Sequence, residues 1–375
     1  MIEIDVSRQL GEFRIEVEIA VEASGITALF GQSGAGKTAL VDMLAGLSRP
    51  DRGRIAINDE VLFDAALRID VPPERRRIGY VFQEDRLFPH MSVRANLEYG
   101  LRRAPASERQ IGLDQVVEVL DVRALLQRRP RTLSGGEKQR ISIGRALLAN
   151  PRLLLMDEPL ASLDAARKNE ILPFIERLSD EFDVPIVYVS HSAEEIVRLA
   201  DTLVLLSDGR VAAIGAVEEL MSRLDLRPLT GRYEAGSVIA ARVSGKDATF
   251  GLAHLAFPGG VLRVPLGGLA LGREVRIRVR ARDVTLSSAR PEGLSTLNVF
   301  EGTVTEVGGD AEPAPLVDVR IDIGVPLWAR ITRRALHDLQ IVPGKRIFAL
   351  IKAVAIDHGS VGLRGQPRRA NRGDG

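Results

Sequence analysis

The sequence predicts an α/β domain built around a parallel sheet, followed by an all-β domain. Two patterns along the 375 residues indicate this. Up to about Pro228, short β-branched runs such as 26–30 alternate with longer helical stretches such as 38–47, which is typical of a parallel sheet covered by helices. From about Gly236 onward the chain shows short alternating strands separated by paired glycines, which is typical of antiparallel β structure.

Composition and charge exclude several classes of protein. The chain has 51 basic and 50 acidic residues, so its formal net charge of +1 gives no global attraction to nucleic acid or anionic lipid. It contains no cysteine, which excludes disulfide frameworks, thiolate metal sites and a cysteine nucleophile. No apolar run approaches the roughly 20 residues that span a bilayer, and the start of the chain lacks the features of a signal peptide. We therefore expect a cytoplasmic chain that does not itself cross a membrane.

Turn-forming residues predict the domain boundaries. Pro228 and the stretch 231–236 indicate a linker, so we expect a first domain over 1–228 and a linker with a first β segment over 229–290. The segment 361–375 is rich in arginine and glycine and is expected to be a disordered tail.

One predicted strand carries a row of arginines. Arg276, Arg278 and Arg280 alternate with apolar residues. Such a row could form an anion-binding face, but alternating charges on a strand usually form its solvated side, and we favour that interpretation.

A glycine-rich segment matches the pattern G-x-x-x-x-G-K-[ST] of phosphate-binding loops. An apolar strand-like run precedes it and a helical pattern follows it, which is the context that such a loop requires. Its glycines let successive N–H groups point at phosphate oxygens, and the following helix N-terminus favours an anion. We expect the lysine to meet the β- and γ-phosphates of a nucleotide and the threonine hydroxyl to bind Mg²⁺. The segment consists of Gly31, Gln32, Ser33, Gly34, Ala35, Gly36, Lys37 and Thr38.

A second apolar run, 153–156, ends in two acids, Asp157 and Glu158. A nucleotide site of this type needs a carboxylate at the end of a neighbouring strand. We expect Asp157 to hold Mg²⁺, directly or through water, and Glu158 to orient and polarise the water that attacks the γ-phosphorus. An acidic pair after a strand is common at protein surfaces. The pair therefore indicates a nucleotide site only because the sequence also contains the phosphate loop upstream.

Another glycine turn, at Ser134, Gly135 and Gly136, leads into the helical pattern 141–148 and offers a second anion site. One chain does not need two such sites for one triphosphate. With this segment, residues 1–228 resemble the nucleotide-binding subunit of the ATP-binding cassette family, whose signature motif is similar. The resemblance implies a P-loop NTPase cassette with a helical subdomain, which binds ATP and Mg²⁺.

The other motifs of that family occur in the expected order. Gln83 resembles the Q-loop glutamine, residues 161–164 resemble the D-loop, and His191 resembles the switch histidine. The resemblance gives Gln83 a role in metal binding and catalysis and gives His191 a catalytic role. A lone glutamine is usually a solvated loop residue, and a lone histidine is more often a hydrogen-bonded structural residue. The catalytic roles are favoured only because the other motifs of the family are also present. Phe13 is the candidate for stacking on the adenine, with a place in the core as the alternative.

The resemblance also implies a head-to-tail homodimer. In such a dimer, Ser134, Gly135 and Gly136 of one subunit cap the γ-phosphate that Lys37 and Thr38 of the other subunit bind. ATP therefore joins the subunits, and its hydrolysis reopens them and converts chemistry into motion.

Cassette ATPases drive transporters, DNA-repair machines and translation factors, so the motifs alone do not decide the function. The sequence has no long heptad insertion, no cysteine cluster and only one phosphate loop, which disfavours the last two classes. Residues 85–93 place apolar side chains in a loop, where transporter ATPases receive a helix of the membrane subunit. Residues 86–97 look most like the ATPase subunit of bacterial molybdate importers.

Residues 291–360 resemble the molybdate-binding β-domain, an oligonucleotide-fold variant, that this subfamily carries after its cassette. Ser295, Asn298, Thr332 and Lys352 are the candidates for binding the oxyanion, which takes hydrogen-bond donors and a cation. A β-barrel that only mediates dimerisation is the alternative, because two neighbouring positions depart from the usual pattern.

These expectations combine into one hypothesis. The chain is the ATP-hydrolysing subunit of a bacterial importer, a homodimer that lies peripherally on the cytoplasmic face of the inner membrane. It works under two permease subunits, and a periplasmic binding protein delivers molybdate. An importer of sulfate, ferric iron or a polyamine is the nearest alternative, and a cassette ATPase acting on nucleic acid is a more distant one. Molybdate at the second domain is expected to stabilise an idle dimer.

Overall fold

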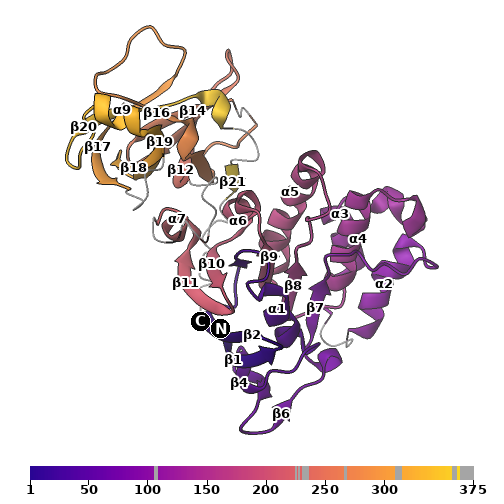
Figure 1. Ribbon diagram of the computed structural model, residues 1–375. Coiled ribbons are helices and arrows are strands. Elements are labelled where there is room, and N and C mark those ends of the chain that lie inside the picture. The colour runs from indigo at the N-terminus through magenta and orange to yellow at the C-terminus, as the bar shows by residue number, and fades with distance from the viewer. Residues whose placement is uncertain are drawn as a thin grey trace, which may run out of the picture. The chain divides into compact units, whose positions relative to one another are not determined.

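The computed structural model describes residues 1–104, 109–223, 226, 229, 236–265, 268–308, 315–356 and 361–363 (Figure 1). The chain divides into two compact units, Met1–Leu220 and Met221–Gly375. The linker expected at Pro228 and 231–235 lies outside the described residues. Across the described residues, no helix combines the length and apolar character needed to cross a membrane.

A six-stranded sheet lies at the centre of the first unit. Its order is β11-β10-β3-β9-β8-β7, and all neighbours are parallel except β10 and β11. β3, β8 and β9 are buried along their whole length, as expected for parallel strands covered on both faces. The strands are β3 (Ile26–Phe30), β7 (Ile78–Val81), β8 (Leu153–Asp157), β9 (Ile186–Ser190), β10 (Thr202–Ser207) and β11 (Arg210–Ala216).

A second, antiparallel sheet of the first unit has the order β2-β1-β4-β5-β6. In β2 every second residue is buried, so this strand turns one face to the core and the other to solvent. The strands are β1 (Ile2–Leu10), β2 (Phe13–Val21), β4 (Arg52–Ile57), β5 (Glu60–Asp64) and β6 (Ile69–Asp70).

Helices cover the parallel sheet and form a separate helical part. α2, α3 and α4 contact one another and make up that part (Figure 1). The α-helices of the first unit are α1 (Lys37–Ala45), α2 (Val93–Arg103), α3 (Leu113–Val119), α4 (Gly135–Leu147), α5 (Ala165–Phe182), α6 (Ala193–Leu199) and α7 (Val217–Leu220). Short 3-10 turns are η1 (Pro73–Arg75), η3 (Arg123–Leu125) and η4 (Pro130–Thr132).

The core of the first unit joins both sheets to α1. It includes Ile4 and Val17 of the antiparallel sheet, Leu40 of α1, and Leu155 and Val189 of the parallel sheet. Because α1 follows the phosphate loop directly, this packing fixes the helix on which the loop depends.

A buried arginine fixes the other end of α1. Arg76 is only 1% exposed, and its Nη1 donates to the carbonyls of Met43 (2.8 Å) and Leu44 (2.9 Å). The last carbonyls of a helix have no partner inside it, and a cation at that end also matches the helix dipole. Asp70 accepts a hydrogen bond from the same guanidinium at 3.2 Å, which compensates part of its charge.

The second unit consists of two five-stranded antiparallel sheets around one core. Their orders are β14-β13-β12-β15-β21 and β16-β20-β17-β18-β19. The first comprises β12 (Gly236–Asp247), β13 (Leu252–Phe257), β14 (Gly260–Val264), β15 (Glu274–Arg280) and β21 (Val361–Leu363). The second comprises β16 (Val284–Ser287), β17 (Asn298–Val307), β18 (Leu316–Asp322), β19 (Pro326–Thr332) and β20 (Arg346–Ile351). In the chain, α9 (Arg333–Asp338) lies between β19 and β20, and the 3-10 turns η6 (Ala281–Asp283) and η7 (Ala353–Ala355) follow β15 and β20.

Strand pairing in the second unit crosses residue 290, where we expected one segment to end and the next to begin. β16 precedes that position and pairs with β20, and β21 pairs with β15. Strand pairing joins segments that are distant in sequence, and all these strands share one core. Val361–Leu363 therefore belongs to a sheet and not to the expected tail, while residues 364–375 lie outside the described residues.

The arginine row of β15 does not form the solvated face that we expected. Arg276 and Arg278 are only 3% and 4% exposed. β15 lies between β12 and β21, and its other face, with Val275 and Ile277, faces the core, so both faces are covered.

The only tryptophan of the sequence anchors the start of the second unit. Trp328 on β19 is 1% exposed, and its ring Nε1–H donates to the carbonyl of Ser222 at 2.9 Å. Its backbone N–H donates to the hydroxyl of Ser237 on β12 at 2.8 Å. The segment that follows Leu220 is thereby tied to a strand about a hundred residues later.

Candidate active site

The phosphate-binding loop connects β3 to α1. Gly34 and Gly36 have φ angles of 84° and 98°, in the left-handed region that residues with a side chain rarely adopt. Gly36 is the N-cap of α1, and no side chain caps this helix. The N–H groups of its first turn lack intrahelical acceptors, so they can bind an anion such as a phosphate.

Lys37 lies under this loop. Its ammonium donates to the carbonyls of Gly31 (2.9 Å) and Gln32 (3.0 Å), and the residue is only 5% exposed. Burial lowers the pKa of Lys37, while the negative charges of Glu158 and Asp157 act in the opposite direction. The ammonium is therefore held by weak neutral acceptors that a phosphate oxygen can replace.

Thr38 and Asp157 lie together across the gap between α1 and β8. The Thr38 hydroxyl donates to Asp157 Oδ1 at 3.3 Å, and the Tyr80 hydroxyl lies 3.0 Å from Asp42 Oδ1 and 3.5 Å from Asp157 Oδ2. Burial raises the pKa of Asp157, and the neighbouring charges of Glu158 and Asp42 raise it further. Burial and the two aspartates also raise the pKa of Tyr80, so its hydroxyl stays a donor.

The donor set around Thr38 and Asp157 fits Mg²⁺. The ion prefers oxygen ligands and keeps several waters, so it needs only one or two protein oxygens beside the phosphates of a nucleotide. Within the described part of the chain, no group of three or more His, Cys, Asp or Glu residues could enclose a metal. The Thr38 hydroxyl and the Asp157 carboxylate, 3.3 Å apart, are oxygen ligands suited to a metal that arrives with a nucleotide.

Glu158 follows Asp157 in an unusual backbone conformation. Its φ of 44° is left-handed, and its N–H donates to the carbonyl of Val189 on β9 at 3.1 Å. This bend carries the carboxylate toward the end of β9, where Oε2 lies 3.2 Å from His191 Nδ1. The Glu158 side chain is 20% exposed and that of His191 is 53% exposed, so both can reach a water.

Two further candidates lie near this edge. Gln83 is exposed, two residues past the end of β7. Phe13 is half-buried at the start of β2, and a methyl group added at Gly36 would lie 3.4 Å from its ring. Its ring thus borders the phosphate loop, which suits a base bound beyond the phosphates.

The signature segment begins α4. The Ser134 hydroxyl accepts from the N–H of Glu137 at 3.2 Å, and the Glu137 carboxylate accepts from the N–H of Ser134 at 2.7 Å, which is a complete capping box. A methyl group at Gly135 would lie 3.2 Å from the Leu163 side chain, so the signature and D-loop segments of the same chain contact each other.

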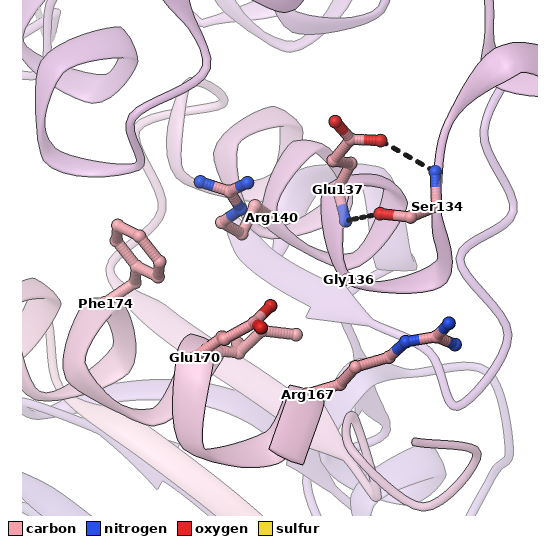
Figure 2. Close-up of a pocket in the computed structure, with 8 residues that line it drawn as sticks. Ser134, Gly136, Glu137, Arg140, Arg167, Glu170 and Phe174 are labelled. Atoms are coloured by element: carbon pink, nitrogen blue, oxygen red, sulfur yellow. Dashed lines mark hydrogen bonds between the residues drawn. The ribbon is translucent and has the colours of Figure 1, made fainter. Parts of the chain in front are cut away.

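A cavity of about 280 Å³ lies beside this helix start, between α4 and α5 (Figure 2). Arg140 lies over the ring of Phe174 with 4.8 Å to its centroid, and both face the space that Glu170 and Arg167 border. The lining consists of Ser134, Gly136, Glu137, Arg140, Arg167, Glu170, Ile171 and Phe174. None of these residues belongs to the phosphate loop, so the two predicted anion sites of one chain are separate.

The structure thus joins Thr38 to Asp157 and His191 to Glu158 by direct contacts at one edge of the sheet. Lys37 lies next to Thr38 in the chain and contacts the carbonyls of the phosphate loop. Sequence analysis missed Tyr80 and Asp42. Tyr80 stands in β7, the strand that precedes Gln83. A partly buried tyrosine hydroxyl needs a polar partner, so its place in this strand could have indicated a contact with the acids of the site.

The oxyanion candidates of the second unit differ in burial: Asn298 is buried, while Ser295, Thr332 and Lys352 are exposed. Asn298 is 1% exposed; its Oδ1 accepts from the N–H of Arg263 (2.7 Å), and its Nδ2 donates to the carbonyls of Arg263 (3.0 Å) and Ile351 (3.3 Å). Both donor hydrogens of this amide are engaged, so Asn298 connects β14 and β20 to β17 and does not fit the predicted role.

The other three candidates remain near the surface. The Thr332 hydroxyl caps α9 by accepting from the N–H of Ala335 at 3.1 Å. Ser295 and Lys352 are exposed. Their role toward an oxyanion stays a prediction.

Comparison with protein families gives two matches. Residues 15–161 match the model described as ABC transporter, and residues 294–357 match that of the TOBE domain. Among solved structures, cbiO1 from Clostridium perfringens, part of the ABC transporter complex cbiONQ, aligns with a TM-score of 0.52 at 23% identity, covering 60% of this chain and 92% of that one. The likeness confirms the predicted cassette fold.

Several relatives match over nearly their whole length. The chain is 53% identical over 362 residues to the "Molybdenum import ATP-binding protein ModC" of Rhodospirillum rubrum, with 95% of this chain and 97% of that protein covered. The protein of the same name from Paramagnetospirillum magneticum is 54% identical over 364 residues, with 96% and 99% covered. "Molybdenum import ATP-binding protein ModC 1" of Azotobacter vinelandii is 50% identical over 345 residues, with 92% and 95% covered.

Replacing Asp157 by Asn should raise the melting temperature of the nucleotide-free chain at about pH 8. Because burial raises the pKa of Asp157, the ionised carboxylate destabilises the fold above that pKa. As the pH falls through the raised pKa, the wild-type carboxyl takes up a proton and the difference should shrink. Thermal unfolding at several pH values checks this, with the exposed Asp5→Asn as the control that shows no such trend. A variant less stable than wild type throughout would contradict the expectation.

Replacing Asn298 by Ala should lower the free energy of unfolding by about 1–3 kcal/mol, because it leaves the partly buried N–H of Arg263 without an acceptor and the buried carbonyl of Ile351 without this donor. Urea unfolding followed by circular dichroism measures the loss. The exposed Ser295→Ala change should have no measurable effect. Equal stability of Asn298→Ala and wild type would show that the amide does not hold these strands together.

Proposed function

Because the chain belongs to the family of molybdenum import ATP-binding proteins, we propose that it is the ATP-hydrolysing subunit of an importer whose cargo is molybdate. One observation carries the ATPase part. The phosphate loop follows β3, Asp157 is the last residue of β8 with Glu158 next to it, and His191 follows β9, so these groups stand at the ends of three adjacent parallel strands at one edge of the sheet. Such an edge is where open α/β sheets bind their ligands.

The proposed reaction is in-line attack of water on the γ-phosphorus of ATP, with ADP as the leaving group. The N–H groups of the phosphate loop and the ammonium of Lys37 bind the β- and γ-phosphates. Glu158 accepts a hydrogen bond from the attacking water and orients it. His191, 3.2 Å from the Glu158 carboxylate, would hold that carboxylate in place and contact the γ-phosphate of a bound nucleotide.

Thr38 and Asp157 would hold Mg²⁺, and Gln83 would reach it from the end of β7. When bound, the ion neutralises charge on the phosphate oxygens. Tyr80 fixes the Asp157 carboxylate through its hydroxyl, so the ligand is oriented before the nucleotide arrives.

We propose further that two chains are needed for one complete site. Within one chain, Ser134 and Gly136 lie at a cavity that the phosphate loop does not line. A head-to-tail homodimer would place Ser134, Gly135 and Gly136 of one subunit against the γ-phosphate bound by the other. Phe13, beside Gly36, would stack on the adenine of its own subunit.

The proposed membrane partners are two permease subunits, which a periplasmic binding protein supplies with molybdate. The chain would then lie peripherally on the cytoplasmic face of the inner membrane. The loop 85–92 supports this, because Asn96 accepts from the N–H of Phe88 (2.9 Å) and donates to the carbonyls of Phe88, Met91 and Ser92. A loop held in this way offers Phe88 and Met91, both half-buried, to a partner helix.

The same loop is tied to the signature helix. Arg145 of α4 donates to the carbonyls of Arg86 (2.9 Å) and Asp85 (3.4 Å), and its guanidinium lies 5.0 Å from the centroid of the Phe88 ring. A movement of the loop under a permease would therefore be passed to α4 and the signature segment. This connection is how ATP-driven closure would reach the membrane.

Replacing Glu158 by Gln should lower kcat for ATP hydrolysis by about 100-fold or more and leave ATP binding intact, because the amide orients water poorly. The variant should therefore accumulate as a dimer with MgATP. Hydrolysis assays and size-exclusion chromatography of the full chain measure both effects. The exposed Glu18→Gln on β2 makes the same charge change and should behave as wild type. Normal hydrolysis by Glu158→Gln would overturn the assigned role.

Calorimetric titration of the full chain should show binding of molybdate and tungstate, but not of the smaller sulfate ion. The triple variant Ser295→Ala, Thr332→Ala, Lys352→Ala should lose this binding, because these side chains supply the two hydroxyls and the cation that we assign to the site. Equal binding of sulfate, or none of any oxyanion by the wild type, would contradict this role and leave the second unit as a scaffold.

A further inference from the structure

A buried carboxylate, that of Glu195, stands shortly after His191 in the chain and has no part in the mechanism described above. Glu195 of α6 is 3% exposed. Its Oε2 accepts from the hydroxyls of Ser190 (2.8 Å) and Tyr188 (2.9 Å), and its Oε1 accepts from the ammonium of Lys168 (2.8 Å). These three donors, one of which is a cation, account for the burial of its charge.

This carboxylate fixes the backbone on both sides of His191. The hydroxyl of Ser190, which donates to Glu195, also accepts from the N–H of Ser192 at 3.0 Å. The hydroxyl of Ser192 in turn accepts from the N–H of Glu195 at 3.4 Å. His191 therefore stands in a closed ring of hydrogen bonds, and its Nδ1 lies 3.2 Å from Glu158.

The direction of the Glu195 side chain is informative. Ser192 and Glu195 have the spacing of a capping box, in which the acid normally accepts from the N–H of the cap residue. α4 shows that arrangement at Ser134 and Glu137. In α6 the hydroxyl of Ser190 accepts from the N–H of the cap residue Ser192. The Glu195 side chain instead binds residues of β9 and α5. Capping of the N-terminus of α6 therefore does not explain the position of the Glu195 side chain.

Lys168 belongs to α5, which begins directly after Asp164 at the end of the D-loop segment. α5 and α6 contact each other (Figure 1), and a second buried ion pair, Glu176 with Arg198 at 2.7 Å, also joins them. It lies eight residues beyond Lys168 on α5, or about 12 Å farther along the helix axis. The same two helices thus carry one ion pair at His191 and one remote from it.

We propose that Glu195 is a positioning residue for ATP hydrolysis. It holds Ser190, and through Ser190 the loop 190–192, so that His191 stays at Glu158. Lys168 neutralises the carboxylate and joins the loop to the helix that follows the D-loop. The inference rests on the proposed roles of Glu158 and His191.

The test compares kinetic and thermal data for the full-length chain with MgATP. Glu195→Ala should lower kcat by roughly 10- to 100-fold with KM for ATP changed less than about 3-fold, because a small displacement of a catalytic group slows the chemical step. Ser190→Ala, which removes only a hydroxyl, should lower kcat in the same way, and Ser190→Thr should keep most of the rate. Glu195→Gln combined with Lys168→Met, which keeps an acceptor without an unpaired charge, should restore kcat to within about 3-fold of wild type.

The remote pair is the matched control. Glu176→Ala breaks the other buried ion pair between α5 and α6, so it should lower the melting temperature and leave kcat within about 2-fold of wild type. If Glu195→Ala and Ser190→Ala only lower the melting temperature, or if Glu176→Ala lowers kcat equally, positioning of His191 is refuted. Absence of hydrolysis by the wild-type chain, or normal hydrolysis by Glu158→Gln, would instead refute the proposed function and the inference with it.

Discussion

Parallel strand pairing is the constraint on which the site depends. Parallel neighbours end at the same edge of a sheet, and the order β7-β8-β9-β3 brings together four loops that are far apart in the chain. Each loop supplies one part: Gln83 after β7, the two acids after β8, His191 after β9 and the phosphate loop after β3. If one strand slipped by one residue along its neighbour, the site residues at its end would move by about 3.3 Å. That displacement would break the hydrogen bonds that join them to the other loops.

Buried charge is the second common element of the first unit. Lys37, Asp157, Arg76 and Glu195 are all less than 10% exposed, and each has polar partners in fixed places. Removing a charge from water costs free energy that the partners offset only when the geometry is good. The fold accepts this cost around the site, where preoriented groups can act on a phosphate without first rearranging.

The fold class of the first unit, and the strand ends at which its motifs stand, could be predicted from sequence because short local patterns specify them. The phosphate loop, the acids after β8 and the histidine after β9 each form a short pattern with a strand before it. The second unit was less predictable. Its strands pair across the expected boundary at residue 290, and pairing between distant segments leaves no local pattern. For the same reason neither the structural role of Asn298 nor the burial of Arg276 could be predicted from their neighbours in the chain.

The position of the single tryptophan gives the molecule a built-in optical reporter. Indole emission depends on the polarity around the ring and on the hydrogen bond of its N–H. Trp328 is buried in the second unit, and its N–H is bonded to Ser222, two residues beyond the end of the first unit. Tryptophan emission, excited selectively over that of tyrosine, therefore reports on the segment that follows Leu220 and not on the cassette itself. A nucleotide-driven change that reaches this segment can be followed without attaching a dye.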